Sequence, residues 1–123
     1  MKLARRKTAS EHGIQAQLFN ELAYKQHPDV IIVAIPNGGL RHALVAISLK
    51  AEGVRPGTPD IVACLREGRA GWLEMKARKG ALRDEQVGFK TKVLKLGHYW
   101  GLARTVDEAL AHLRSWGALR EGC

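Results

Sequence analysis

Three side chains that could act on a phosphodiester lie close together in the stretch "PGTPDIVACLREGRAGWLEMKARKG". Asp60 precedes one apolar run, and Glu74 and Lys76 close a second run beyond a glycine-containing break. Both runs predict strands, and a turn centred near Glu67 would join them as an antiparallel hairpin. In that register Asp60 lies opposite Glu74, and side-chain alternation places Glu74 and Lys76 on the same face.

This arrangement is suited to metal-assisted hydrolysis. Two adjacent carboxylates repel each other, and a hard divalent cation relieves that repulsion. A bound metal lowers the pKa of its water and clamps a phosphate oxygen, while a neighbouring lysine offsets developing charge. The same residues could instead form a surface hairpin with a cross-strand ion pair, so both interpretations stay open at this point.

The composition predicts one basic globular domain that binds a polyanion. The chain has 123 residues and a formal net charge of +8, which favours a nucleic-acid partner or a solvated basic surface. We expect one domain over 1–123, with 1–9 as a flexible basic tail. No apolar run reaches the roughly 18 residues of a membrane span, and no apolar segment follows the basic start of the chain. We therefore expect a cytoplasmic protein that does not associate with a membrane.

The two cysteines do not indicate a metal or disulfide framework. Cys64 lies in an apolar run and is expected to be a buried thiol, whereas Cys123 is expected to be exposed. Neither has another Cys or His at metal-ligand spacing, which argues against a zinc site.

The apolar patterns predict a mixed sheet flanked by helices. Ser10 can cap a helix whose apolar stripe begins at Ile14, and "VIIVAIP" indicates a continuous buried strand. Thr105 and Glu108 form a capping box before the last helix. The expected helices cover 11–26, 40–53, 83–97 and 105–117, and the expected strands cover 30–36, 60–65, 71–77 and 98–104. The order α-β-α-β-β-α-β-α predicts an α/β fold.

Several of these motifs together resemble a known family. "SEHGIQ", "IPNGG", "KAEGVRPGTPD" and "WLEMKARKGALRDEQ" are similar to the motifs of a stand-alone VRR-NUC domain, a virus-type replication-repair nuclease of the PD-(D/E)xK superfamily. The resemblance covers about 10–113. It implies a restriction-endonuclease-like core and a Mg²⁺- or Mn²⁺-dependent deoxyribonuclease.

The resemblance also implies roles for individual residues. Asp60 and Glu74 match the metal-binding acids, Lys76 matches the catalytic lysine, and the backbone carbonyl of Met75 is a further metal ligand. Gln86 matches a glutamine on the next helix that supports the site.

One more acid is expected from the first helix. Glu11 matches an acid that completes the metal site, and Glu21 is the competing candidate. An acid in the first turn of a helix also stabilises the helix dipole without any metal, so Glu11 has a purely structural alternative.

A third group could contact the phosphates of a nucleic acid. Asn37, Gly38 and Gly39 form either a tight turn or a backbone surface near the substrate. The charged candidates are Arg41, Lys79 and Arg83, each of which could equally be an ordinary surface charge.

The resemblance further implies a structure-selective endonuclease of DNA repair that acts on branched DNA such as four-way junctions. A cut through both strands of a duplex needs two active sites, so we expect a two-fold symmetric homodimer. The alternatives are a non-catalytic basic module that binds nucleic acid, and a restriction-type endonuclease.

Overall fold

The computed structural model describes residues 2–36 and 48–123, with side chains from Glu11 onward. The predicted order of elements is confirmed wherever the chain is described. The elements are α1 (Lys2–Lys25), β1 (Ile31–Ala34), β2 (Ile61–Cys64), β3 (Ala70–Met75), α3 (Asp84–Lys95), β4 (Tyr99–Ala103) and α4 (Val106–Ser115). Most of the helix expected over 40–53 lies outside the described residues, although 48–51 are helical.

The four strands form one mixed sheet in the order β1-β2-β3-β4. The first two pairs are antiparallel, and β3 and β4 run parallel. Ile61 pairs with Leu73, which confirms the predicted hairpin register. The hairpin closes through a 3.0 Å hydrogen bond from the Leu65 N–H to the Arg69 carbonyl. Gly68, at φ +81°, supplies the left-handed residue that a three-residue hairpin loop requires.

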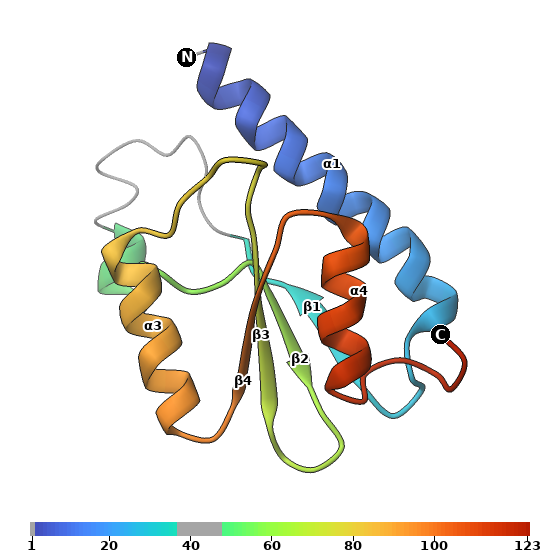
Figure 1. The fold of residues 1–123 in the computed structure, drawn as a ribbon. Coiled ribbons are helices and arrows are strands. Elements are labelled where there is room, and N and C mark those ends of the chain that lie inside the picture. Colours follow the sequence, from blue (N-terminus) through green and yellow to red (C-terminus); the bar gives the residue numbers. More distant parts are fainter. Residues whose placement is uncertain (1, 37–47) are drawn as a thin grey trace.

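Helices cover the sheet on both faces (Figure 1): α1 and α4 lie on one face, and α3 lies on the other. The core is packed between the sheet and the pair α1 and α4, and its fully buried members include Leu18, Leu73 and Leu113. Gly71 lets α4 approach closely, because a Cβ there would stand 2.4 Å from the Trp116 ring. None of the helices in the described part of the chain is long and apolar enough to span a membrane.

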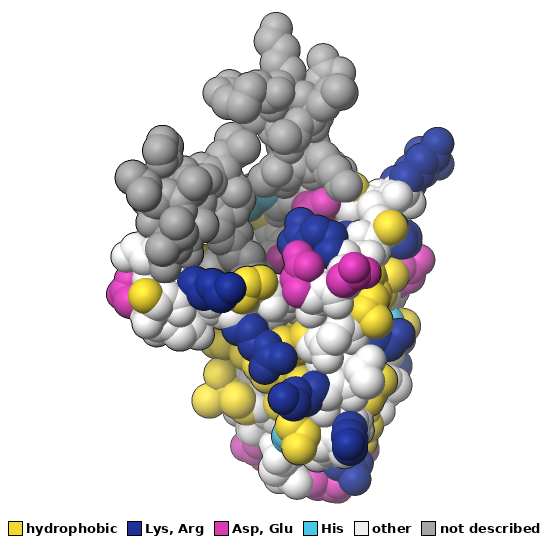
Figure 2. All heavy atoms as spheres, turned by 90° about the vertical axis from the view of Figure 1, so that its left-hand side faces the viewer, with side chains coloured by type: hydrophobic (Ala, Val, Ile, Leu, Met, Phe, Trp, Pro, Cys, Tyr) yellow, Lys and Arg dark blue, Asp and Glu magenta, His cyan; other side chains and the backbone are white. Residues whose placement is uncertain are grey.

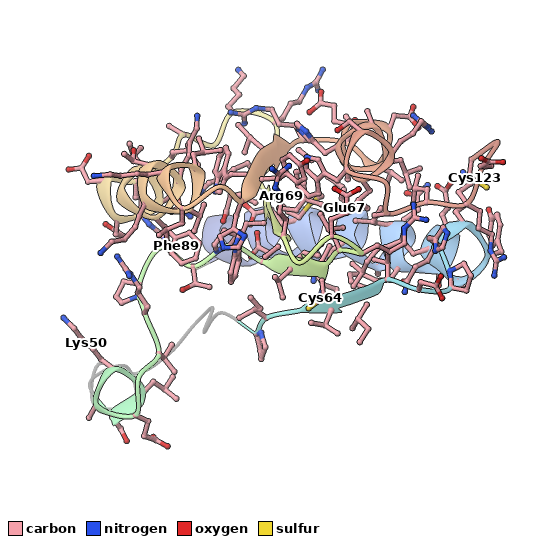
Figure 3. All side chains as sticks on the ribbon, turned by 90° about the horizontal axis from the view of Figure 1, so that it is seen from below. Lys50, Cys64, Glu67, Arg69, Phe89 and Cys123 are labelled. Atoms are coloured by element: carbon pink, nitrogen blue, oxygen red, sulfur yellow. The ribbon has the colours of Figure 1, made fainter. Side chains whose placement is uncertain are left out.

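The outer face of β1 and β2 is exposed, which contradicts the expectation of a fully buried first strand. Ile31 is 62% exposed and Val33 45% exposed, whereas Ile32, on the opposite face, is buried. Cys64 is likewise exposed rather than buried, and its side chain points away from α1 (Figure 3). The reason is that α3 packs over β3 and β4, so that among the described helices only those on the opposite face cover β1 and β2.

The first helix begins earlier than predicted. We expected it to start at Glu11 behind a Ser10 cap, but α1 already begins at Lys2. Residues 2–9 are therefore helical, while the flexibility expected for them stays a prediction. The physical reason is that lysine, leucine, alanine and arginine are all strong helix formers and no breaker separates them from the apolar stripe.

Candidate active site

The two candidate acids of the hairpin lie side by side. Asp60 is the residue before β2, and Glu74 is the fifth residue of β3. The Asp60 Oδ2 accepts a 2.8 Å hydrogen bond from the Met75 N–H, which fixes the aspartate against the end of the partner strand. The Glu74 carboxyl shares a side-chain hydrogen bond with Asp60. The hairpin register is therefore what brings these two carboxyl groups together.

Glu74 is deeply buried and its ionisation is disfavoured. Only 4% of the residue is exposed. Burial, followed by the charge of Asp60, raises the pKa of Glu74 to about 8, whereas the charge of Lys76 opposes that rise. A buried carboxyl beside a second carboxyl resists losing its proton unless a positive charge is near.

Lys76 brings such a positive charge to the same face. Its N–H donates to the Ala103 carbonyl at 3.0 Å, which extends the pairing with β4 by one residue beyond β3. Only 8% of the residue is exposed. A buried ammonium is costly unless a negative charge is near, and the Lys76 charge interacts favourably with an ionised Glu74.

Gln86 connects the start of α3 to the acids. Its Nε2 donates to the Glu74 Oε2 at 3.2 Å, and its Oε1 accepts from the Arg83 N–H at 2.9 Å. The second bond satisfies a free N–H at the beginning of the helix and so orients the amide nitrogen toward Glu74. In the sequence, this geometry is indicated by a glutamine three residues after Arg83, the residue that caps the helix.

Of the two acids proposed for α1, Glu11 is the one that reaches the site region. Its Oε2 accepts from the Ala77 N–H at 3.4 Å, directly after Lys76. Glu21 instead forms an ion pair with Lys25 at 2.6 Å within the helix. Ten residues separate the two acids, which corresponds to about 15 Å along an α-helix.

Arg104 was not singled out from the sequence. Its Nη1 donates to the Ala77 carbonyl at 2.8 Å, so the backbone after Lys76 is held on one side by Glu11 and on the other by Arg104. The backbone N–H of Arg104 in turn donates to the Glu108 Oε1 at 2.8 Å. In the sequence, the one feature that distinguished Arg104 was its position just before the last capping box. A charged residue in a turn usually indicates only a solvated surface.

The other predicted residues lie at the edge of the site or outside the described chain. Lys79 and Arg83 are exposed, and the Arg83 Nε forms an ion pair with the Glu85 Oε1 at 3.0 Å. The remaining candidates fall outside the described residues: Asn37, Gly38, Gly39 and Arg41.

The donor set fits a hard divalent cation through a pair of acids. Across the described residues, no three His, Cys, Asp or Glu side chains gather as a metal-holding group. Asp60 and Glu74 are nevertheless adjacent, and Mg²⁺ typically takes one or two carboxylates together with waters and substrate oxygens. A cation is also the charge that would favour ionisation of the buried Glu74. The role of the Met75 carbonyl stays a prediction.

Comparison with solved structures defines the class of fold. The chain is similar to a solved "VRR_NUC domain protein" with a TM-score of 0.72 and 18% sequence identity, over 87% of this chain and 87% of that chain. No protein-family model matches the sequence, and no curated protein matches it. The fold is thus an α/β fold shared with that protein. More narrowly, it is the VRR-NUC fold that the sequence motifs predicted.

Proposed function

We propose that this protein is a metal-dependent deoxyribonuclease that hydrolyses phosphodiester bonds. The observation that best supports the proposal is the buried carboxyl of Glu74, which lies between Asp60 and Lys76 on a VRR-NUC fold. Ionisable groups with strongly shifted pKa values are concentrated at functional sites. In a purely structural hairpin, ionising a carboxyl in such surroundings would oppose folding.

The acids would hold Mg²⁺ or Mn²⁺. Asp60 and Glu74 contribute carboxylate oxygens, Met75 contributes its backbone carbonyl, and Glu11 completes the site from α1. When bound, the ion supplies an activated water and neutralises charge on the scissile phosphate.

Lys76 and Gln86 would position the reacting groups. The Lys76 ammonium orients the attacking water and offsets negative charge as it develops on the phosphate oxygens. Gln86 holds one oxygen of Glu74 through its Nε2, and the other oxygen would bind the metal. Burial of both acid and lysine keeps bulk water away from these charges and strengthens their interaction.

The proposed substrate is branched DNA, such as a four-way junction, in a repair context. The net charge of +8 favours a polyanion, and the exposed Lys79 and Arg83 would contact phosphates beside the site, together with Asn37, Gly38 and Arg41. Paired cuts need two active sites, so the active form is proposed to be a homodimer.

A cleavage assay tests the proposal. Wild type, Glu74→Ala and the control Glu21→Ala are incubated with labelled four-way junction, flap, linear duplex and single strand, each with Mg²⁺, Mn²⁺ or EDTA. We expect metal-dependent cutting by wild type and Glu21→Ala only, with the junction preferred. Salt-sensitive binding by all three proteins without cutting would instead identify a non-catalytic binding module.

Light scattering tests the assembly. We expect the mass of a dimer, with or without DNA. A monomer mass under both conditions would overturn the homodimer while leaving the nuclease proposal in place.

A further inference from the structure

A groove of about 670 Å³ runs beside α3, outside the candidate active site. One wall is the loop over 53–60 and the other is a stripe of α3. Arg55 lines the loop wall, and Lys92 and Lys95 line the helix wall. On this side of the molecule, Figure 2 shows Lys and Arg side chains in a row down the face that carries α3. The groove therefore combines a hollow shape with positive charge.

The groove and the candidate active site share the same two supporting elements. Gly57, at φ +88°, brings the loop against the start of α3, because a Cβ there would stand 2.2 Å from the Glu85 carbonyl oxygen. Asp60 follows three residues later on the loop, and Gln86 follows Glu85 on the helix. The groove and the acids are therefore carried by neighbouring residues of the same loop and the same helix.

The groove is held open by packing and its charge is not neutralised from within. The Arg55 guanidinium lies 5.7 Å from the Phe89 ring centre, and Figure 3 shows Phe89 on α3 beside the segment that follows Lys50. Among the lining residues, Glu85 is the acid, and its carboxylate is engaged with Arg83 at 3.0 Å. The charge left facing the groove is positive.

Gly88 leaves part of the groove without a side chain. It lies in the interior of α3 and lines the groove. A glycine weakens a helix interior relative to alanine, and a Cβ at this position would meet nothing within 4 Å. The packing of the described chain therefore does not require glycine here. Its missing side chain leaves the groove floor open to a closely approaching backbone.

We propose that this groove binds the sugar-phosphate backbone of the DNA strand that leads away from the scissile phosphate. The stripe from Glu85 to Lys95 is about 15 Å long, which matches roughly four nucleotide steps of one strand. Arg55, Lys92 and Lys95 contact phosphates and therefore position the strand without reading its bases. This inference rests on the proposed function and specifies its substrate path.

The first test compares removal of two charges from the groove with removal of two charges elsewhere. Binding of a labelled linear duplex is measured in EDTA over a range of salt concentrations for wild type, Lys92→Ala/Lys95→Ala and the control Arg66→Ala/Arg120→Ala. We expect the groove variant to lose about tenfold or more in affinity, with the salt slope reduced by about two. An affinity loss no larger than that of the control would overturn the proposal.

The second test uses Gly88, where stability and binding should change in opposite directions. Gly88→Ala is expected to raise the melting temperature, and Gly88→Gln is expected to lower DNA affinity by fivefold or more by filling the groove. Val87→Gln, an exposed position on the same helix, is the matched control. If Gly88→Gln binds DNA as tightly as Val87→Gln, the groove does not hold the strand.

The two proposals fail in different ways. If wild type cuts DNA while the groove variants bind and cut as the controls do, the strand path is wrong and the nuclease stands. If the groove variants lose affinity in EDTA while wild type cuts no DNA with any metal, the strand path stands and the nuclease is wrong.

Discussion

The two faces of the central sheet bury different kinds of side chain. On the face covered by α1 and α4, β3 presents Leu73 and Met75 to an apolar core. On the face covered by α3, the same strand presents Glu74, followed by Lys76, and both are almost as well buried. The difference shows how one strand can provide stability on one face and chemistry on the other, because its side chains alternate.

The faces also differ in how their polar groups are satisfied. On the α3 face, the Gln86 Nε2 donates to Glu74 and the Met75 N–H donates to Asp60. Burying such groups opposes folding unless their charge is compensated. If this comparison is correct, variants on the apolar face should lose stability, and variants on the α3 face should lose function.

The largest expected effect is on the apolar face. Leu73 is fully buried, so Leu73→Ala should lower the free energy of unfolding by about 2–5 kcal/mol through lost burial and the cavity left behind. Urea unfolding measures this. Val54→Ala, at an exposed position, is the control and should change little. A loss of less than about 1 kcal/mol for Leu73→Ala would show that this face is not the main core.

The second effect concerns function on the α3 face. Lys76→Met should reduce the DNA cleavage rate by about 10²–10³-fold, because it removes the charge that stabilises the transition state. The fold should be retained, since methionine fills a similar space and Glu74 can keep its proton. Single-turnover cleavage measures the rate, with Arg120→Met, an exposed charge away from the site, as the control. If Lys76→Met cleaves DNA at the wild-type rate, the catalytic role assigned to Lys76 is wrong.

A third effect is the dependence of stability on pH in EDTA. The pKa of Glu74 is raised from 4.5 to about 8 in the folded protein. The folded state therefore binds the proton more tightly than the unfolded state between these values. The proton on Glu74 therefore stabilises the folded state fully below about pH 4.5, and this stabilisation is lost as the pH rises through about 8.

Relative to Glu74→Gln, which has no such proton, the wild-type melting temperature should fall between pH 5 and pH 8 in EDTA. Mg²⁺ should reduce that fall, because a bound cation favours the carboxylate. Parallel melting curves for the two proteins would show that Glu74 ionises normally.

The smallest expected effect is at Gln86. Gln86→Ala removes one hydrogen bond to Glu74, worth roughly 0.5–1.5 kcal/mol, and should slow cleavage by up to about tenfold. The metal concentration needed for half-maximal cleavage should rise as well, because the carboxylate is less well oriented. Val87→Ala, at an exposed position on α3, tests whether any substitution on this helix has the effect. Equal rates for both variants would assign Gln86 to the helix cap alone.

Local sequence signals predicted the hairpin that carries the acids. Gly68 and alternating side chains define the β2–β3 pairing over only a few residues, and the structure confirms that register. The sequence also determined the order of the described elements, because apolar periodicity and caps such as Thr105 act within one or two turns. The proximity of Asp60 to Glu74 follows from these local effects.

Contacts between distant segments were decided only by the tertiary structure. Glu11 and Gln86 could be connected to the hairpin through a family resemblance, but not from spacing, since dozens of residues separate Glu11 from Ala77. The exposure of Cys64 likewise depends on where α3 packs, which the apolar strand pattern does not encode. Arg104 reaches Ala77 because β4 lies parallel to β3. Such packing depends on how whole helix and sheet surfaces fit together, whereas strands and turns are specified by neighbours in the chain.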